Sequence, residues 1–199
     1  MKDVRGGYEA IAVGASAGGL LPIKELILAL PPGFSLPLII VQHMAESHDG
    51  WWIAHLGRLA DVPVKEVDEK EAILPGSVYL APGNYHLLVE PDRTFGLSIE
   101  GRVNHARPSI DVLFETAADA YGSGLVGVVL SGGNADGAEG LLRIKERGGL
   151  TIVQDPDTAE APSMPLAAIR TARPDHVLAP ARITELLIAL HHQRTTSPP

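Results

Sequence analysis

The sequence predicts an α/β fold: a doubly wound, mostly parallel sheet in a Rossmann-like three-layer arrangement, with one antiparallel hairpin. Apolar runs of strand length recur along the 199 residues, and helical patterns separate most of them. The runs lack the alternation of apolar and polar residues that marks a sheet with one solvated face. Strands and helices that alternate in this way form a parallel sheet with helices on both faces.

The predicted strands are six apolar runs. They are EAIAV at Glu9–Val13, LIIVQ at Leu38–Gln42, SVYLA at Ser77–Ala81, LVGVVL at Leu125–Leu130, LTIVQ at Leu150–Gln154 and HVLA at His176–Ala179. The predicted helices lie at Leu20–Leu30, Asp49–Leu59, Ser109–Tyr121, Gly137–Arg147, Leu166–Thr171 and Ile183–His191. In HLLVEPDRTFGLSIE, two alternating runs flank Pro91, Asp92 and Arg93, which predicts an antiparallel hairpin.

Composition predicts a single soluble domain over residues 1–199, with a core from about 9 to 190 and a frayed polar tail at 191–199. Apolar residues make up 45% and charged residues 20% of the chain, and no apolar run reaches the ~18 residues of a membrane span. The N-terminus lacks the apolar segment of a secretory signal, so we expect a cytoplasmic location.

Two counts exclude further classes of function. The chain has no cysteine, which rules out disulfides, thiolate metal sites and a cysteine nucleophile. Its net charge of −8, without a cluster of lysine or arginine, argues against binding to nucleic acid or to an anionic membrane. We therefore expect a protein or small-molecule partner.

Three polar residues follow predicted strands at one edge of the sheet, where ligands of open parallel sheets bind. Ser16 follows the first strand in VGASAGG, His43 directly follows LIIVQ, and Asp136 lies in SGGNADGAEG after LVGVVL. An activated serine needs a base that takes the hydroxyl proton and a carboxylate that fixes the imidazole tautomer and stabilises its cation. The sequence therefore predicts a catalytic triad of Ser16, His43 and Asp136.

The glycines around Ser16 favour the same chemistry. Gly14, Gly18 and Gly19 lack Cβ, which allows a tight turn from strand to helix and a close approach of the substrate to the hydroxyl.

Backbone amides near the turn are the expected oxyanion donors. The start of a helix offers free N–H groups where an oxyanion would form. We expect the amide of Ala17 to be one donor and an amide of Gly132 or Gly133 to be another.

Other interpretations stay open on sequence alone. His86, after VYLAPGNY, could replace His43 as the base, and Asp155, after LTIVQ, could replace Asp136. His43 could also be a hydrogen-bonded structural residue, and Asp136 could cap the helix that begins near Gly137.

Binding of phosphate or metal fits the sequence poorly. In GASAGG, Ser16 replaces the middle glycine of G-x-G-x-x-G, and no acidic residue ends the second strand. No lysine follows Gly19 as it would in a P-loop, and no pair of histidines has the spacing of a metal site.

Six segments in order resemble the catalytic domain of the chemotaxis protein-glutamate methylesterases, the CheB family. They are IAVGASAGGL, LIIVQHM, VYLAPGNYHL, RPSIDVLFETAA, GVVLSGGNADGAEGL and GGLTIVQDPDTAEAPSMPLAAI. The likeness runs from about Ile11 to about Ile183. The order serine, histidine, aspartate differs from the order in α/β-hydrolases, which disfavours a generic lipase or esterase.

The resemblance implies hydrolysis of glutamyl methyl esters on chemoreceptor-like signalling proteins and, in some members, deamidation of glutamine. It makes Ser16 the nucleophile, His43 the base and Asp136 the orienting acid, and it implies no cofactor. In this family an N-terminal receiver domain commonly covers the site, whereas this chain begins almost at the first catalytic strand. We therefore expect a standalone domain whose partners are a methylated receptor and a separate receiver or regulatory protein.

Three positions depart from the family pattern. Gly133 and Asn134 stand where methionine and glycine are usual before the aspartate, and Ala17 stands in place of a usual threonine. Two of these positions, 17 and 133, carry amides that are expected oxyanion donors. The altered turn before the aspartate, together with the receiver domain that is missing from this sequence, favours one alternative: a catalytically idle signalling module that binds its partner through the same edge of the sheet.

Overall fold

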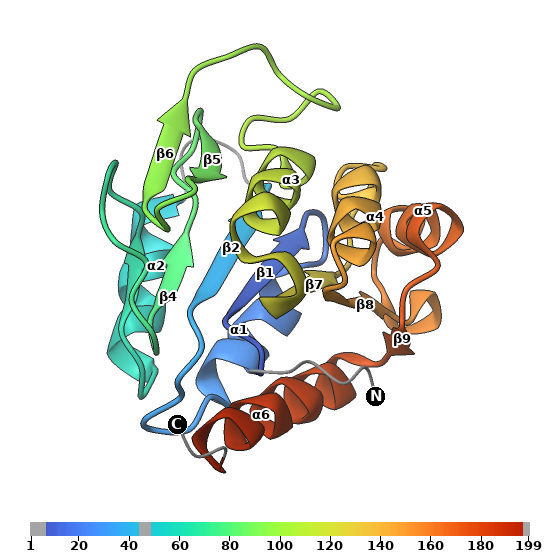
Figure 1. Cartoon of the computed structure of the whole chain (residues 1–199). Coiled ribbons are helices and arrows are strands. Elements are labelled where there is room, and N and C mark those ends of the chain that lie inside the picture. Colours follow the sequence, from blue (N-terminus) through green and yellow to red (C-terminus); the bar gives the residue numbers. More distant parts are fainter. Residues whose placement is uncertain (1–6, 44–48, 197–199) are drawn as a thin grey trace.

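The computed structural model of the chain describes residues 7–43 and 49–196 and shows a central sheet with helices on both faces (Figure 1). The sheet has seven strands in the order β3-β4-β2-β1-β7-β8-β9, and all its neighbouring strands are parallel. The strands are β1 (Ala10–Ala15), β2 (Leu38–Gln42), β3 (Val64–Glu66), β4 (Val78–Leu80), β7 (Leu125–Val129), β8 (Leu150–Gln154) and β9 (His176–Leu178). The predicted doubly wound sheet is confirmed.

A separate two-stranded ribbon confirms the predicted hairpin. It pairs β5 (His86–Val89) with β6 (Phe95–Ser98) in antiparallel register. The helices are α1 (Leu20–Leu28), α2 (Asp49–Leu59), α3 (Ile110–Tyr121), α4 (Ala138–Glu146), α5 (Ser163–Ala172) and α6 (Pro180–Thr196), and two short 3₁₀ turns are η1 (Gly122–Gly124) and η2 (Pro156–Thr158).

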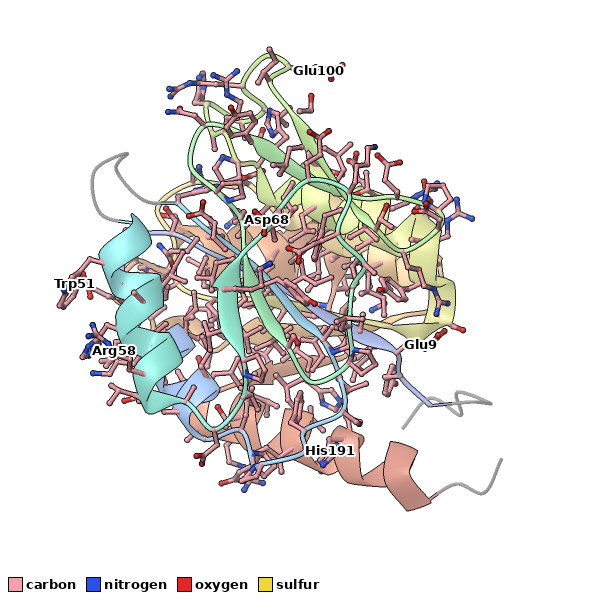
Figure 2. The ribbon with its side chains drawn as sticks, turned by 90° about the vertical axis from the view of Figure 1, so that its left-hand side faces the viewer. Glu9, Trp51, Arg58, Asp68, Glu100 and His191 are labelled. Atoms are coloured by element: carbon pink, nitrogen blue, oxygen red, sulfur yellow. The ribbon has the colours of Figure 1, made fainter. Side chains whose placement is uncertain are left out.

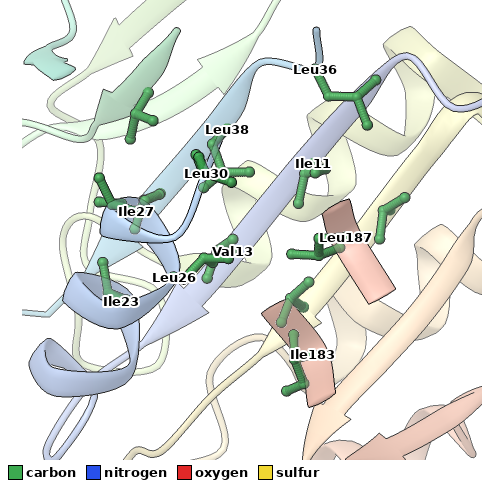
Figure 3. Packing of buried hydrophobic residues seen from close by; sticks show 14 of the residues in the cluster. Ile11, Val13, Ile23, Leu26, Ile27, Leu30, Leu36, Leu38, Ile183 and Leu187 are labelled. Carbon is green, nitrogen blue, oxygen red and sulfur yellow. The ribbon is translucent and has the colours of Figure 1, made fainter. Parts of the chain in front are cut away.

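The two faces of β1 carry different side chains, because successive residues of a strand point to opposite sides. Ile11 and Val13 pack with buried residues of α1, α2 and α6. Figure 3 shows this cluster, in which Ile23 of α1 and Ile183 of α6 lie over the sheet. Ala10 and Ala12 face the second cluster, which α3, α4, α5 and the β5–β6 ribbon cover.

Three elements differ from the sequence predictions by more than two residues at a boundary. The prediction missed β3, a short edge strand with two charged residues, because edge strands need not form apolar runs. The start of α5 at Ser163 was also missed, since Pro165 argues against a helix. Proline is nevertheless tolerated in the first turn, because a backbone N–H at that point makes no hydrogen bond within the helix.

The last helix is longer than predicted. It begins with Pro180 at its first position, where proline is favoured, and it runs to Thr196. Residues 191–196, expected to be frayed, are therefore helical, and residues 197–199 lie outside the described residues.

The strand order places the rim of β1, β2 and β7 at the point where the winding of the sheet reverses. From β1 the chain adds β2 on one side, and later β7 on the other. Ligands of open α/β sheets bind beyond the carboxyl ends of the strands at such a point. Ser16 follows β1, His43 follows β2 and Asp136 follows β7, so the topology brings these three segments to one place.

Candidate active site

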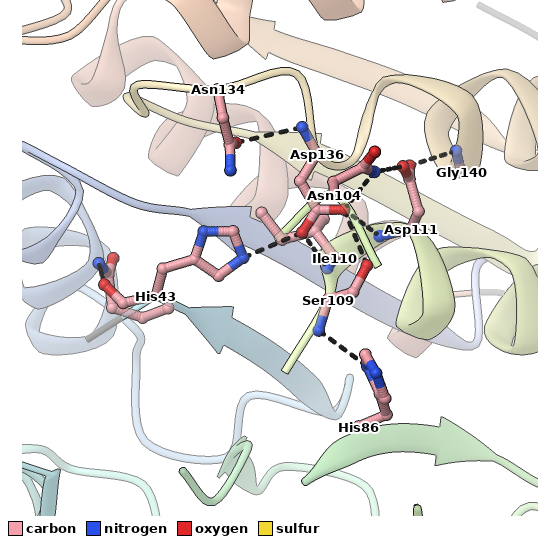
Figure 4. Close-up of polar contacts among 10 residues, drawn as sticks. His43, His86, Asn104, Ser109, Ile110, Asp111, Asn134, Asp136 and Gly140 are labelled. Atoms are coloured by element: carbon pink, nitrogen blue, oxygen red, sulfur yellow. Dashed lines mark hydrogen bonds and ion pairs between the residues drawn. The ribbon is translucent and has the colours of Figure 1, made fainter. Parts of the chain in front are cut away.

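The structure brings His43 and Asp136 into direct contact across 93 residues of sequence. The imidazole Nε2 of His43 lies 2.9 Å from Oδ2 of Asp136, and the other ring nitrogen points away from the carboxylate (Figure 4). The backbone N–H of His43 donates to the carbonyl of Ala15 at 3.0 Å, which continues the β1–β2 ladder by one residue. Ser16 and His43 therefore directly follow the paired residues Ala15 and Gln42, at the ends of two adjacent strands; such strands lie about 4.8 Å apart in a sheet.

Asp136 lies fully buried among hydrogen-bond donors. Besides His43, the donors are Ser109 Oγ at 2.8 Å, the backbone N–H of Ile110 at 2.7 Å, that of Asp111 at 3.2 Å, and Asn104 Nδ2 at 3.0 Å. Two of these donors are the first amides of α3, so the carboxylate caps this helix. Its negative charge is also stabilised by the positive N-terminal end of the dipole of α3. The alternative that Asp136 caps its own helix is wrong, because α4 has no side-chain cap.

The hydrogen bonds decide the charge of Asp136. Burial alone would raise the pKa of this carboxyl, but the bonds from His43, Ile110, Asn104 and Ser109 together lower the pKa to about 2. Asp136 is therefore an anion at neutral pH, as a partner for an imidazolium must be.

A second buried carboxyl lies beside the first. Burial raises the pKa of Asp111 to about 6, against the hydrogen bond from the Gly140 amide and with the help of the negative charge on Asp136. Asn104 joins the two carboxylates, because its Nδ2 donates to Oδ2 of Asp111 at 2.7 Å and to Oδ1 of Asp136. The sequence analysis missed Asn104, Ser109 and Asp111, since nothing local marks a residue that holds a distant carboxylate.

Ser16 is partly exposed and shares an open cavity with His43. The cavity has a volume of about 600 Å³. Its lining residues are Ser16, Ala17, Gly18, Leu20, Leu21, Gln42, His43, Trp51, Trp52 and Glu160. The backbone N–H of Ser16 donates to the carbonyl of Ser131 at 2.9 Å, which ties the turn to the end of β7. The backbone of Ser16 is thus fixed at the edge of the cavity that this residue lines.

Only part of the role predicted for the glycines holds. Gly18 has a φ of +75° and lines the cavity, so the tight turn requires it. Gly14 instead makes room for α3: a Cβ at this position would lie 2.3 Å from Cγ2 of Ile110. The close approach of Ile110 is what lets its amide reach Asp136.

Gln42 is a site residue that the sequence analysis did not identify. Its Nε2 donates to the carbonyl of Ser16 at 2.8 Å and to the carbonyl of His43 at 2.9 Å. One side chain therefore fixes the backbone at both Ser16 and His43. A glutamine at the end of an otherwise apolar strand is the signal that could have indicated it.

The amides expected to bind the oxyanion differ in whether their N–H groups already have an acceptor. Ala17 lines the cavity, and its N–H has no acceptor among the described residues. Gly132 is wrong as a donor, because its N–H is bonded to the carbonyl of Ala161 at 2.9 Å. Gly133 has an exposed backbone, and within the described ranges its N–H is also unbonded.

The two rival residues have structural roles. His86 is 2% exposed, and both of its ring nitrogens are engaged: Nε2 donates to the carbonyl of Gly101, and Nδ1 accepts the Ser109 amide. Asp155 accepts the N–H of Asp157 and so caps the η2 turn. In the described part of the chain, neither is bonded to Ser16 or His43.

Comparison with known proteins agrees with this geometry. The family model for CheB methylesterase matches residues 11–187, which contain Ser16, His43 and Asp136. The chain belongs to the CheB methylesterase family. This family consists of carboxylic ester hydrolases, so the site is that of a hydrolase family.

Individual CheB relatives cover more than nine-tenths of this chain. A crystal structure of the Thermotoga maritima CheB methylesterase catalytic domain superposes with a TM-score of 0.87 at 32% identity, covering 92% of this chain and 98% of that one. A Leptospira interrogans protein, provisionally named protein-glutamate methylesterase/protein-glutamine glutaminase, is 52% identical over 92% of this chain and 95% of its own length. A Methanospirillum hungatei protein named protein-glutamate methylesterase/protein-glutamine glutaminase 2 is 40% identical over 97% of this chain but only 54% of its own length.

Two further properties concern the described residues alone. None of their helices is both long and apolar enough to cross a membrane. No group of three or more histidine, aspartate or glutamate side chains among them is arranged to hold a metal ion.

Proposed function

We propose that this chain hydrolyses the methyl ester of a protein glutamyl side chain, with Ser16 as nucleophile, His43 as general base and Asp136 as the orienting carboxylate. The observation that carries the proposal is the 2.9 Å contact between His43 Nε2 and the buried Asp136, on an imidazole that lines the same cavity as Ser16. A base held by an anion and facing a serine is the arrangement that activates a hydroxyl.

The contact with Asp136 assigns the two imidazole nitrogens. Nε2–H donates to the carboxylate, so Nδ1 is left as the atom that takes a proton from Ser16. In the usual triad the two nitrogens have the opposite roles. The chemistry is unchanged, because either nitrogen of a neutral imidazole accepts a proton while the other donates.

The reaction then proceeds in two balanced steps. Ser16 Oγ attacks the ester carbonyl carbon while Nδ1 takes the hydroxyl proton; the proton passes to the departing methoxy oxygen, which leaves as methanol. Water, deprotonated by the same nitrogen, then attacks the carbonyl carbon of the glutamyl-enzyme ester; the bond to Ser16 Oγ breaks, the proton on Nδ1 passes to that oxygen, and glutamate is released with the free serine restored. No step needs a cofactor.

Backbone amides stabilise the oxyanion of both steps. The N–H of Ala17 is free in the described structure and lines the cavity, which makes it the first donor. The N–H of Gly133 is the second, in place of Gly132. The glycine at 133 keeps the donor, so the departure from the family pattern is compatible with catalysis.

The relatives support the choice of substrate. Proteins 52% and 40% identical to this chain carry names that give protein-glutamate methylesterase and protein-glutamine glutaminase activities. We extend the proposal to methylated chemoreceptor-like proteins in the cytoplasm, to deamidation of glutamine at the same site, and to control by a separate receiver or regulatory protein.

A peptide with one glutamyl methyl ester tests the proposal by release of methanol. Ser16→Ala should lower the rate by a factor on the order of 10⁴ to 10⁶, since the nucleophile is lost. The matched control is Ser123→Ala, an exposed serine in η1 before the start of β7, which should keep the parent rate.

Labelling by a fluorophosphonate gives a second readout. The parent protein should be labelled at Ser16, and His43→Ala should not be labelled. A parent protein that neither reacts with the probe nor releases methanol would support the idle signalling module instead.

A further inference from the structure

Apart from Ser16, Gln42 and His43, the residues that line the cavity beside Ser16 are small or apolar, with one acidic residue among them. Leu20 and Leu21 of α1 and Trp51 and Trp52 of α2 form what we call the apolar wall. It is open to solvent: Leu21 is 63% and Trp51 is 71% exposed, and Figure 2 shows Trp51 projecting outward from α2. Among the described lining residues there is no lysine or arginine, and Glu160 is the one carboxylate.

The backbone next to Glu160 is bonded to the turn that carries Ser16. The N–H of Ala161 donates to Oγ of Ser131 at 2.9 Å, and that hydroxyl donates to the carbonyl of Ala17 at 2.7 Å. The carbonyl of Ala161 accepts the N–H of Gly132. Ser131 is fully buried, so this connection is a fixed part of the fold rather than a surface contact.

The side chain of Glu160 lies directly against the nucleophile turn. A Cβ placed on Gly18 would lie 2.5 Å from Cβ of Glu160 and 3.2 Å from its carboxyl carbon. Gly18 is two residues after Ser16, so the carboxylate is at the mouth of the site. The absence of a Cβ at Gly18 is what admits it.

We propose that Glu160 is a specificity-determining residue that makes the site prefer glutamyl methyl esters flanked by basic or neutral residues over esters flanked by acidic ones. The inference rests on the proposed function and deepens it. The methyl ester is neutral, and the apolar wall has no charge that could interact with the residues on either side of the methyl-glutamyl residue. Glu160 is therefore the one charge among the described lining residues that can distinguish between substrates, by attracting a flanking cation and repelling a flanking anion.

The expected size of the effect follows from Coulomb's law. A unit charge on the substrate that lies about 6 Å from the Glu160 carboxylate in a water-like dielectric changes kcat/KM about threefold. Exchange of one flanking lysine for glutamate therefore changes kcat/KM about tenfold. The Debye length falls to about 3 Å in 1 M salt, so the preference should largely disappear there.

The same charge acts on the product. Hydrolysis turns a neutral ester into a carboxylate beside Glu160, and repulsion between two anions favours release. Glutamate-containing product peptide should therefore inhibit the parent protein less than it inhibits Glu160→Gln.

The test compares three peptides that differ only in the residues beside the methyl-glutamyl residue: lysine, glutamine or glutamate. Methanol release gives kcat/KM for each at low ionic strength and in 1 M salt. Glu160→Gln should bring the lysine-to-glutamate ratio close to one, and Glu160→Lys should reverse it. The matched control is Glu146→Gln, which removes the same charge from the far, C-terminal end of α4 and should keep the parent ratio.

The outcomes separate this inference from the proposed function. A parent protein that hydrolyses all three peptides equally, or whose ratio is the same in Glu160→Gln, overturns the role of Glu160 and leaves the esterase intact. A ratio that changes as much in Glu146→Gln shows an effect of net charge alone and also overturns it. No methanol from any peptide defeats the proposed function, and this inference with it.

Discussion

Two strands of the sheet end in the same three residues, Ile-Val-Gln, and each is followed by a residue that could belong to a catalytic triad. β2 ends at Gln42 and is followed by His43, whereas β8 ends at Gln154 and is followed by Asp155. His43 turns toward Asp136, but Asp155 caps the η2 turn.

The glutamines also have different partners. Gln42 donates to two backbone carbonyls, those of Ser16 and His43. Gln154 uses both ends of its amide: Oε1 accepts the Ser131 N–H at 2.9 Å, and Nε2 donates to the carbonyl of Thr158.

Strand order explains the difference. β2 pairs directly with β1, which Ser16 follows, while β8 pairs with β7 and is one strand further from β1. The same local sequence is therefore followed by a histidine bonded to Asp136 in one place and by a turn cap in the other. Chemistry at a strand end depends on which strand lies beside it.

The largest expected effect separates the two aspartates. Asp136→Asn should lower kcat by a factor on the order of 10⁴, because a neutral amide no longer holds the imidazole tautomer or stabilises its cation. Asp155→Asn, on the same rim, should leave kcat within about twofold, since it removes a turn cap only. Steady-state methanol release measures both, with circular dichroism to verify that each variant is folded. An equal loss in Asp155→Asn would contradict the assignment of the acid.

A smaller effect separates the two glutamines. Gln42→Leu removes both bonds that align Ser16 and His43, and we expect kcat to fall about 10- to 100-fold with little change in KM. Gln154→Leu leaves the buried N–H of Ser131 without its acceptor and should lower the free energy of unfolding by about 1–3 kcal/mol. Its effect on kcat should be the smaller of the two. Kinetics and urea unfolding of both variants give the comparison; if Gln42→Leu changed stability alone, Gln42 would have no positioning role.

The smallest effect concerns the buried carboxyl of Asp111. Its pKa is about 6 in the folded chain and 3.8 as the ordinary value, so the folded chain binds this proton more tightly. Its contribution to stability is fully present below pH 3.8 and is lost as pH rises through 6. Between pH 7.5 and 5 the parent protein should therefore gain about 1 kcal/mol of unfolding free energy from this group.

The variant Asp111→Asn isolates that contribution. It lacks the titrating proton, so the difference in unfolding free energy between the parent and the variant should change by about 1 kcal/mol over the same pH range. Urea denaturation at the two pH values measures it. A difference that stays constant with pH would show that Asp111 does not titrate in this range.

Much of the fold was predictable because its signals are local. The apolar runs at β1, β2, β7 and β8 predicted strands of a parallel sheet, and β2 and β8 were predicted with their observed bounds. The polar edge strand β3 and the proline-containing start of α5 lacked such signals and were missed. β3 forms because β4 pairs with it. The start of α5 forms because the first turn of a helix tolerates proline.

The candidate site divides in the same way. Serine, histidine and aspartate after three strands can be read from the chain, because a buried parallel strand delivers the residue after it to a common rim. The catalytic roles of Ser16, His43 and Asp136 stay a prediction until the variants are measured. Gln42, Asn104 and Glu160 were not identified, because a hydrogen bond or a neighbouring charge from a distant segment leaves no periodic trace in the sequence.

The sequence by itself thus determined the class of fold, the rim and the chemical groups that the rim offers, since these depend on side-chain type and on the order of elements along the chain. Only the tertiary structure decided that Asp136 rather than Asp155 meets a histidine, that the amides of α3 keep that carboxylate charged, and that Gly18 admits Glu160. Each of these facts is a contact between residues far apart in the chain, and the packing of the helices on the sheet selects which of them form.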